Sequence, residues 1–171
     1  MNELARSTLR VARAAQRIAS QVNAAPEEGR PSETQHVIPM AVVRRTRGYI
    51  ESTANQINGT YEKGYYDACA VMLRRLVETL IIEVYEHLGI ECQIKDGSGN
   101  YLKLSELIDR ILNEPALNLT RNSKTGLPKL KWLGDLSAHN PTFCACRQDL
   151  DNVIPSLRVV VQELVHKAGL K

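Results

Sequence analysis

The sequence predicts an all-α fold, an up-and-down bundle of about five to six helices. Apolar residues recur at the 3.6-residue spacing of helices along most of the chain. Aromatic residues make up only 5% of the 171 residues, whereas strands favour aromatic and β-branched side chains. The length suits one domain. We therefore expect one bundle over residues 36–171, preceded by a basic helix and linker over residues 1–35.

The N-terminal segment is predicted to begin with an amphipathic helix over residues 3–23. Leu4, Val11, Ala15, Ile18 and Val22 fall on one face of this helix. Arg6, Arg10, Arg13 and Arg17 fall on the other face. Residues 24–35 contain two prolines, one glycine and three glutamates, a composition typical of a linker.

Two further helices are predicted over residues 40–58 and 62–88. Asn58-Gly59 should end the first, and Gly89 should end the second. The second is long enough to be the central helix of a bundle. The inward positions of the two helices are predicted to be Val42, Val43, Tyr49, Ile50, Ala54 and Ile57, then Tyr66, Cys69, Leu73, Leu76, Leu80, Val84 and Leu88.

The remaining elements follow from turn and breaker residues. Residues 96–100 (DGSGN) predict a turn, residues 101–113 a fourth helix, and residues 120–126 a polar loop. A shorter helix over residues 128–139 should end before Pro141, because proline disfavours helical geometry in the residue before it. The last helix is predicted over residues 147–168, with Leu150, Ile154, Leu157, Val161, Leu164 and Val165 inward and a bend at Pro155.

Bulk properties narrow the class of protein. The net charge of +3 is too small to indicate nucleic-acid binding by itself. We expect no signal peptide, because residues 4–22 carry arginines instead of an apolar core, and the cysteines should therefore be reduced. The apolar runs are too short to span a membrane, so we expect a cytoplasmic location. No phosphate-binding glycine loop and no Gly-x-Ser-x-Gly elbow is present, so we expect no cofactor.

The clearest basic feature is the arginine content of residues 1–47, which hold eight arginines and four glutamates. These side chains could bind nucleic-acid phosphates, or they could form a solvated helix face without a ligand. No aromatic residues that would stack on bases are interleaved with them. The candidate nucleic-acid-binding residues are Arg6, Arg10, Arg13, Arg17, Arg44, Arg45 and Arg47.

Two polar clusters are candidates for chemistry. Asp135 and His139 lie four residues apart, so they could pair on one helical face, and a paired histidine can act as a general base. The alternative is a polar helix end. On the central helix, Glu78 lies within reach of both Arg74 and Arg75. That cluster could bind a substrate, or it could be an ionic clamp between helices.

Cys144-Ala-Cys146 near His139 raises the question of a metal site. Zinc sites usually require four ligands and spacings such as Cys-x-x-Cys with a second pair. Cys69 and Cys92 lie on other segments, so we predict no metal.

Two segments resemble the HEPN superfamily: YYDACAVMLRRLVETLI at residues 65–81 and LGDLSAHNP at residues 133–141, followed by a long final helix. Within it, residues 61–171 most resemble a bacterial domain of unknown function, number four-one-four-five, which accompanies restriction and defence proteins. The resemblance implies a helical bundle that dimerises. Active members are metal-independent ribonucleases that use an arginine, four to six residues and then a histidine.

His139 matches the histidine of this motif, and Asp135 matches the polar residue that follows its arginine. The resemblance gives the histidine the role of promoting attack by the RNA 2′-hydroxyl and the arginine that of stabilising the phosphate. The arginine itself is missing: Gly134 stands at the four-residue spacing. Arg74 or Arg75 would have to replace it from the central helix.

The sequence thus leaves three functions open. The first is a non-catalytic HEPN-like interaction module, a homodimer in a defence or RNA-related system, with RNA or a protein as partner. The second is a ribonuclease that uses His139 with Arg74 or Arg75. The third is a purely structural helical domain.

Overall fold

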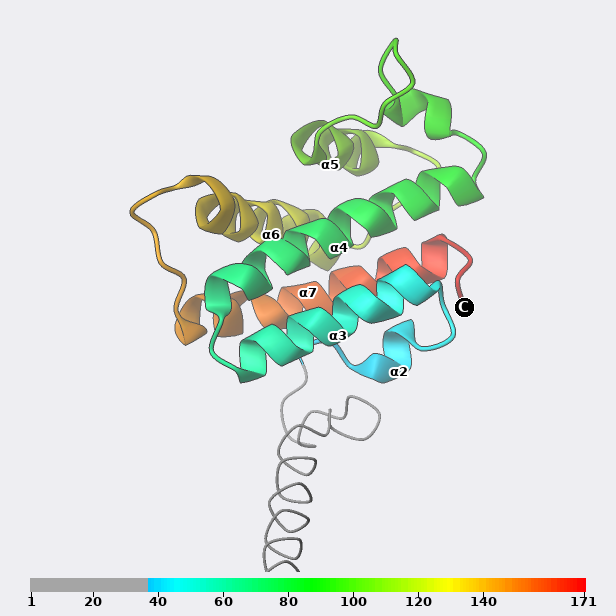
Figure 1. Cartoon of the computed structure of the whole chain (residues 1–171). Coiled ribbons are helices and arrows are strands. Elements are labelled where there is room, and N and C mark those ends of the chain that lie inside the picture. The colour runs from blue at the N-terminus through cyan, green and yellow to red at the C-terminus, as the bar shows by residue number, and fades with distance from the viewer. Residues whose placement is uncertain (1–36) are drawn as a thin grey trace, which may run out of the picture. The chain divides into compact units, whose positions relative to one another are not determined.

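A computed structural model describes residues 37–171, which form six α-helices and one short 3-10 helix without a β-strand (Figure 1). The all-α prediction is therefore confirmed for this part of the chain. The predicted helix and linker over residues 1–35 lie outside the described residues. The helices are α2 (Met40–Val43), α3 (Gly48–Glu62), α4 (Tyr66–His87), η2 (Glu91–Ile94), α5 (Leu104–Asn113), α6 (Arg121–His139) and α7 (Arg147–Lys167).

The central helix is α4, which packs against α3, α5, α6 and α7. Its predicted apolar stripe from Cys69 to Val84 is buried, whereas Leu88 is exposed beyond the end of the helix. The helix begins at Tyr66 and not at residue 62, because Gly64 adopts a positive φ of 76° and turns the chain between α3 and α4. At its other end, Gly89 adopts a φ of 68°, as the predicted stop requires.

The single helix predicted over residues 40–58 is wrong, because the chain breaks between α2 and α3. Arg45 takes a positive φ of 65°, and its backbone N–H donates a hydrogen bond of 2.6 Å to Glu51 Oε1. Asn58 does not end α3 either. Its side chain is buried and bonds the backbone N–H and C=O of Ile38, both at 2.9 Å, so the helix continues to Glu62. Tyr49, predicted inward, is exposed.

The polar loop predicted over residues 120–126 is also wrong, because these residues begin α6. The side chain of Thr120 accepts a hydrogen bond from the Ser123 N–H at 3.3 Å and caps the helix. A Cβ on Gly126 would lie 3.1 Å from Val160 Cγ2, so this first stretch of α6 packs closely on α7. Pro128 therefore lies inside the helix and does not start it.

The other elements follow the sequence closely. Asp96 Oδ1 accepts hydrogen bonds from the backbone N–H groups of Ser98 (2.8 Å) and Asn100 (2.9 Å), which confirms the predicted turn. The fourth helix begins at Leu104, because Tyr101 pairs with Lys95 in an isolated bridge. Helix α7 spans Arg147–Lys167 and buries every inward position that was predicted for it.

Within residues 37–171, no helix combines the length and the apolar content that crossing a membrane would require.

Candidate functional site

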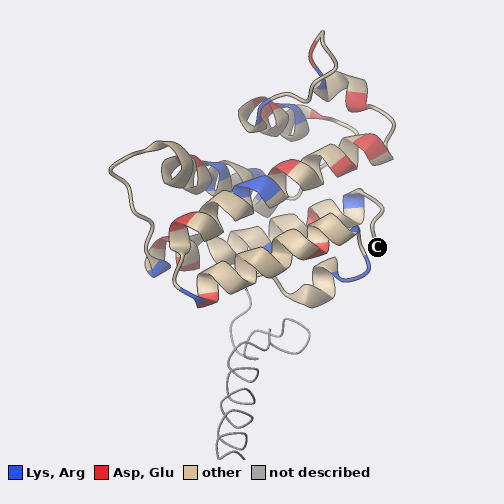
Figure 2. Cartoon of the chain, viewed as in Figure 1, with Lys and Arg blue, Asp and Glu red and all other residues tan. Residues whose placement is uncertain are grey.

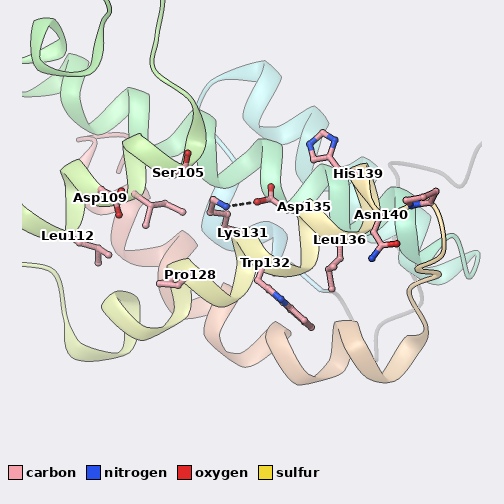
Figure 3. A pocket seen from close by; sticks show the side chains of 12 residues that line it. Ser105, Asp109, Leu112, Pro128, Lys131, Trp132, Asp135, Leu136, His139 and Asn140 are labelled. Carbon is pink, nitrogen blue, oxygen red and sulfur yellow. Dashed lines mark hydrogen bonds and ion pairs between the residues drawn. The ribbon is translucent and has the colours of Figure 1, made fainter.

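A groove of about 780 Å³ lies between α5 and α6, here called the α5–α6 groove. Figure 3 shows side chains from both helices lining it. Its apolar lining consists of Ile108, Leu112, Pro128, Trp132, Leu136 and Pro141. Its polar lining consists of Ser105, Asp109, Lys131, Asp135, His139 and Asn140. The groove therefore joins an apolar wall to the polar residues singled out in the sequence.

Trp132 is an exposed large apolar side chain in the lining of the groove, with 61% of its surface accessible. It is the only tryptophan of the chain. Trp132 and Leu136 are one helical turn apart and project from the same side of α6 (Figure 3). Sequence reasoning missed Trp132, because helical spacing alone does not show which flank of a half-buried helix its neighbours leave uncovered.

Asp135 is held between two cations from two helices. Arg74 Nε on α4 lies 2.8 Å from Asp135 Oδ1, and the Lys131 ammonium, one turn earlier on α6, bonds Oδ2. Burial raises the pKa of Asp135, but the hydrogen bonds and positive charges of Lys131 and Arg74 outweigh that effect and leave its pKa below the ordinary value. The carboxylate is thus a stable anion that ties α6 to α4.

Sequence reasoning also missed Lys131, which it did not identify as a partner of Asp135. The signal was present, because the two residues are four apart on one helix.

The predicted cluster on the central helix is only partly formed. Arg74 Nη1 lies 3.9 Å from Glu78 Oε2, at the outer limit of an ion pair. Among residues 37–171, no ion pair joins Arg75 to Glu78, and Arg75 is exposed. The helix-to-helix ionic clamp therefore exists, but it consists of Arg74 and Asp135, not of both arginines with Glu78.

His139 lies at the end of α6, exposed and next to the groove (Figure 3). Both oxygens of Asp135 are occupied by Arg74 and Lys131, so the pairing of Asp135 with His139 does not form. Within the described part of the chain, no hydrogen bond or ion pair is made to the His139 side chain. The structure thus brings Arg74, Glu78 and Asp135 together, while no side-chain hydrogen bond or ion pair among residues 37–171 joins His139 or Arg75 to them.

Gly134 explains how α4 and α6 come so close. A Cβ at this position would lie 2.6 Å from Arg74 Cβ and 3.2 Å from the Ala70 carbonyl oxygen. Such distances leave no space for any side chain. Helix α4 thus crosses α6 with Arg74 against Gly134, the position at which the HEPN resemblance would place the motif arginine.

Of the candidate nucleic-acid-binding arginines, Arg6, Arg10, Arg13 and Arg17 lie outside the described residues. Arg44 and Arg45 are exposed at the break between α2 and α3. Arg47 is exposed as well, but its Nε is 3.0 Å from Oε2 of the buried Glu83, whose other oxygen accepts a bond from the Tyr49 hydroxyl. The hydrogen bond from Arg47 to Glu83 and the negative charge of Glu83 raise the pKa of Arg47. Arg47 thus neutralises a buried carboxylate, whatever else it binds.

The cysteines show no metal-binding arrangement. Cys92, Cys144 and Cys146 are exposed, and Cys69 is buried, where loss of hydration raises the pKa of its thiol to about 12. In the part of the chain that the structure describes, no three histidine, cysteine or acidic side chains are placed to hold one ion.

No protein-family model, curated protein or solved structure matches this chain. The HEPN relationship therefore stays a prediction that rests on the two segments quoted above.

Proposed function

We propose that the protein is an HEPN-like interaction module that binds a partner protein and does not catalyse a reaction. The observation that carries this proposal is the exposure of Trp132, 61% accessible beside the α5–α6 groove. Tryptophan contributes disproportionately to protein–protein binding energy when a partner covers it. A groove with an apolar wall and a polar rim is the usual form of a site that receives a partner's side chains.

The surroundings of His139 support a role without catalysis. A general base needs a group that orients it, and Asp135, the nearest acid on its helix, is engaged by Arg74 and Lys131. The positions separated from His139 by four to six intervening residues hold Gly134, Leu133 and Trp132, none of which carries a cationic side chain that could stabilise a phosphate.

One observation favours a second function, a ribonuclease. Arg74 lies against Gly134, where the resemblance would place the motif arginine, and so it could supply the missing guanidinium from α4. In this alternative His139 is the base, and Arg74 must leave Asp135 to reach the phosphate.

Cleavage of RNA by the purified full chain separates the two functions. We expect no cleavage above the level of a His139→Ala variant. Cleavage that requires both His139 and Arg74 would establish the ribonuclease. RNA binding that weakens steeply with salt, without cleavage, would instead indicate phosphate contacts by arginines.

Partner binding is tested with Trp132→Ala and a matched control. Tyr65→Ala removes another exposed aromatic side chain, 62% accessible and outside the groove lining. We expect a partner identified by affinity capture to bind the wild type and Tyr65→Ala equally. Trp132→Ala should bind it at least about tenfold more weakly, as for a hot-spot residue. Equal binding by all three proteins would remove the groove from the proposal.

A further inference from the structure

The α5–α6 groove is elongated along α6. Its lining includes Pro128 inside that helix and His139 at its last residue, which lie about 16 Å apart by the helical rise of 1.5 Å per residue. In Figure 3, Asp109 and Leu112 lie at one end of the groove and His139 lies at the other, with Trp132 between them. The groove thus has the length of about three helical turns.

The walls of the groove limit the kind of chain that can lie in it. They are two α-helices, whose backbone N–H and C=O groups bond within each helix. Among residues 37–171 there is also no β-strand whose edge an extended peptide could join. An extended segment on the apolar wall would leave its backbone groups without partners, whereas a helix bonds them internally. The groove therefore favours a helical occupant with an apolar stripe.

The charge of the groove depends on which residues of α5 and α6 line it, because both helices carry acidic and basic residues (Figure 2). In the lining, Lys131 and Asp135 bond each other, and Arg74 bonds Asp135 from α4. Asp109 is exposed in the lining and forms no ion pair with any residue between 37 and 171. Arg110, the next residue, is not part of the lining. Within this part of the chain, the α5 end of the groove therefore presents a carboxylate that no cation neutralises.

This carboxylate discriminates between classes of partner. A nucleic-acid strand in the groove would bring its phosphates toward Asp109, and like charges placed together weaken binding. A lysine or arginine of a partner protein would instead form a charge-assisted hydrogen bond with Asp109. Charge complementarity thus favours a basic protein segment over a nucleic acid.

We infer that the α5–α6 groove takes an amphipathic helix of a partner protein, about three turns long, with a lysine or arginine at one end of its apolar stripe. The apolar stripe covers Leu112, Trp132 and Leu136, and the basic side chain bonds Asp109. This inference rests on the proposed partner-binding function and adds the chemical class of the partner.

Selection from a random peptide library against the purified full chain tests this chemistry. The probes are displayed peptides of about 15 residues, enough for roughly four helical turns. We expect the selected peptides to carry apolar residues spaced three and four apart, with lysine or arginine beside them, and to become helical when they bind. Trp132→Ala should weaken their binding at least about tenfold, which identifies the peptides that occupy the groove.

The charge of the partner is tested with Asp109→Lys. This variant should bind the selected basic peptides at least about tenfold more weakly, because it places like charges together. A peptide in which glutamate replaces the basic residue should regain binding to Asp109→Lys. Glu62→Lys is the matched control, since it reverses an exposed carboxylate at the end of α3, outside the groove lining, and should leave binding unchanged. Circular dichroism shows that both variants are folded.

Two kinds of result would overturn the inference. Peptides that require Trp132 but show no preference for basic residues, or that bind the wild type and Asp109→Lys equally, refute the basic helix and leave the proposed function intact. Single-stranded RNA that changes the fluorescence of Trp132, where no selected peptide does, would assign the groove to a nucleic acid. A library that yields no peptide dependent on Trp132 would remove the groove from both proposals.

Discussion

Replacing Gly134 by alanine tests the close approach of α4 and α6. The added Cβ would lie 2.6 Å from Arg74 Cβ and 3.2 Å from the Ala70 carbonyl oxygen. Both atoms are fixed to the α4 backbone, so relief requires the two helices to move apart. Overpacking of this kind costs about 1–3 kcal/mol, while alanine in place of a helical glycine returns up to about 1 kcal/mol. We therefore expect a net destabilisation of about 1 kcal/mol, with a few tenths more if the bond from Arg74 to Asp135 also lengthens.

Gly59→Ala provides the matched control. Gly59 lies within α3, and no heavy atom lies within 4 Å of the position its Cβ would take. The helix-propensity gain should be similar for both variants, so the difference between them isolates the packing cost, about 1–3 kcal/mol. Urea unfolding followed by circular dichroism gives both free energies. Equal stabilities within about 0.5 kcal/mol would refute the reasoning, because they would show that α6 does not need a glycine to pass Arg74.

Three further outcomes are expected. Asn58→Ala should lower the free energy of unfolding by about 2–4 kcal/mol, because it leaves the backbone N–H and C=O of Ile38 buried without partners; a loss below 1 kcal/mol in urea unfolding, on the order of one surface hydrogen bond, would contradict this. Asp135→Asn should cost about 1 kcal/mol near neutral pH. Because the folded-state pKa of Asp135 lies below its ordinary 3.8, the wild type should lose this advantage as the pH falls through the folded pKa, and a difference that persists below that pKa would count against the ion pairs. Trp132→Ala should change the free energy of unfolding by less than about 0.5 kcal/mol, and a large loss would show that the side chain belongs to the core. The tryptophan fluorescence of the wild type comes from this one residue, so it should respond to any ligand that enters the groove.

The long helices could be predicted from local pattern because their apolar periodicity is strong. The stripe from Cys69 to Val84 and the inward face of α7 are buried as predicted. Two predictions failed where a tertiary contact overrides a local signal. Asn58 is a common helix terminator, but here its amide satisfies the backbone of a distant residue, and the helix continues. Residues 120–126 are polar in sequence, yet packing on α7 recruits them into α6.

The sequence could identify residues of the candidate site, but not which of them bond to one another. Spacing brought Asp135 and His139 to attention, and the same spacing relates Asp135 to Lys131. Which neighbour Asp135 bonds depends on α4, which carries Arg74 to within 2.8 Å of it. The guanidinium from another helix makes a charge-assisted hydrogen bond to this carboxylate, a kind of bond that is stronger than one between neutral groups.

By itself, the sequence determined that this protein is helical and aliphatic in its core, with a long central helix and a polar turn after His139, because periodicity and breaker residues act locally. Only the tertiary structure decided that α4 and α6 cross at Gly134, that Arg74 forms an ion pair with Asp135, and that Trp132 and Arg75 remain accessible. These outcomes depend on the distance and rotation between helices, which are set by side chains that are far apart in the chain.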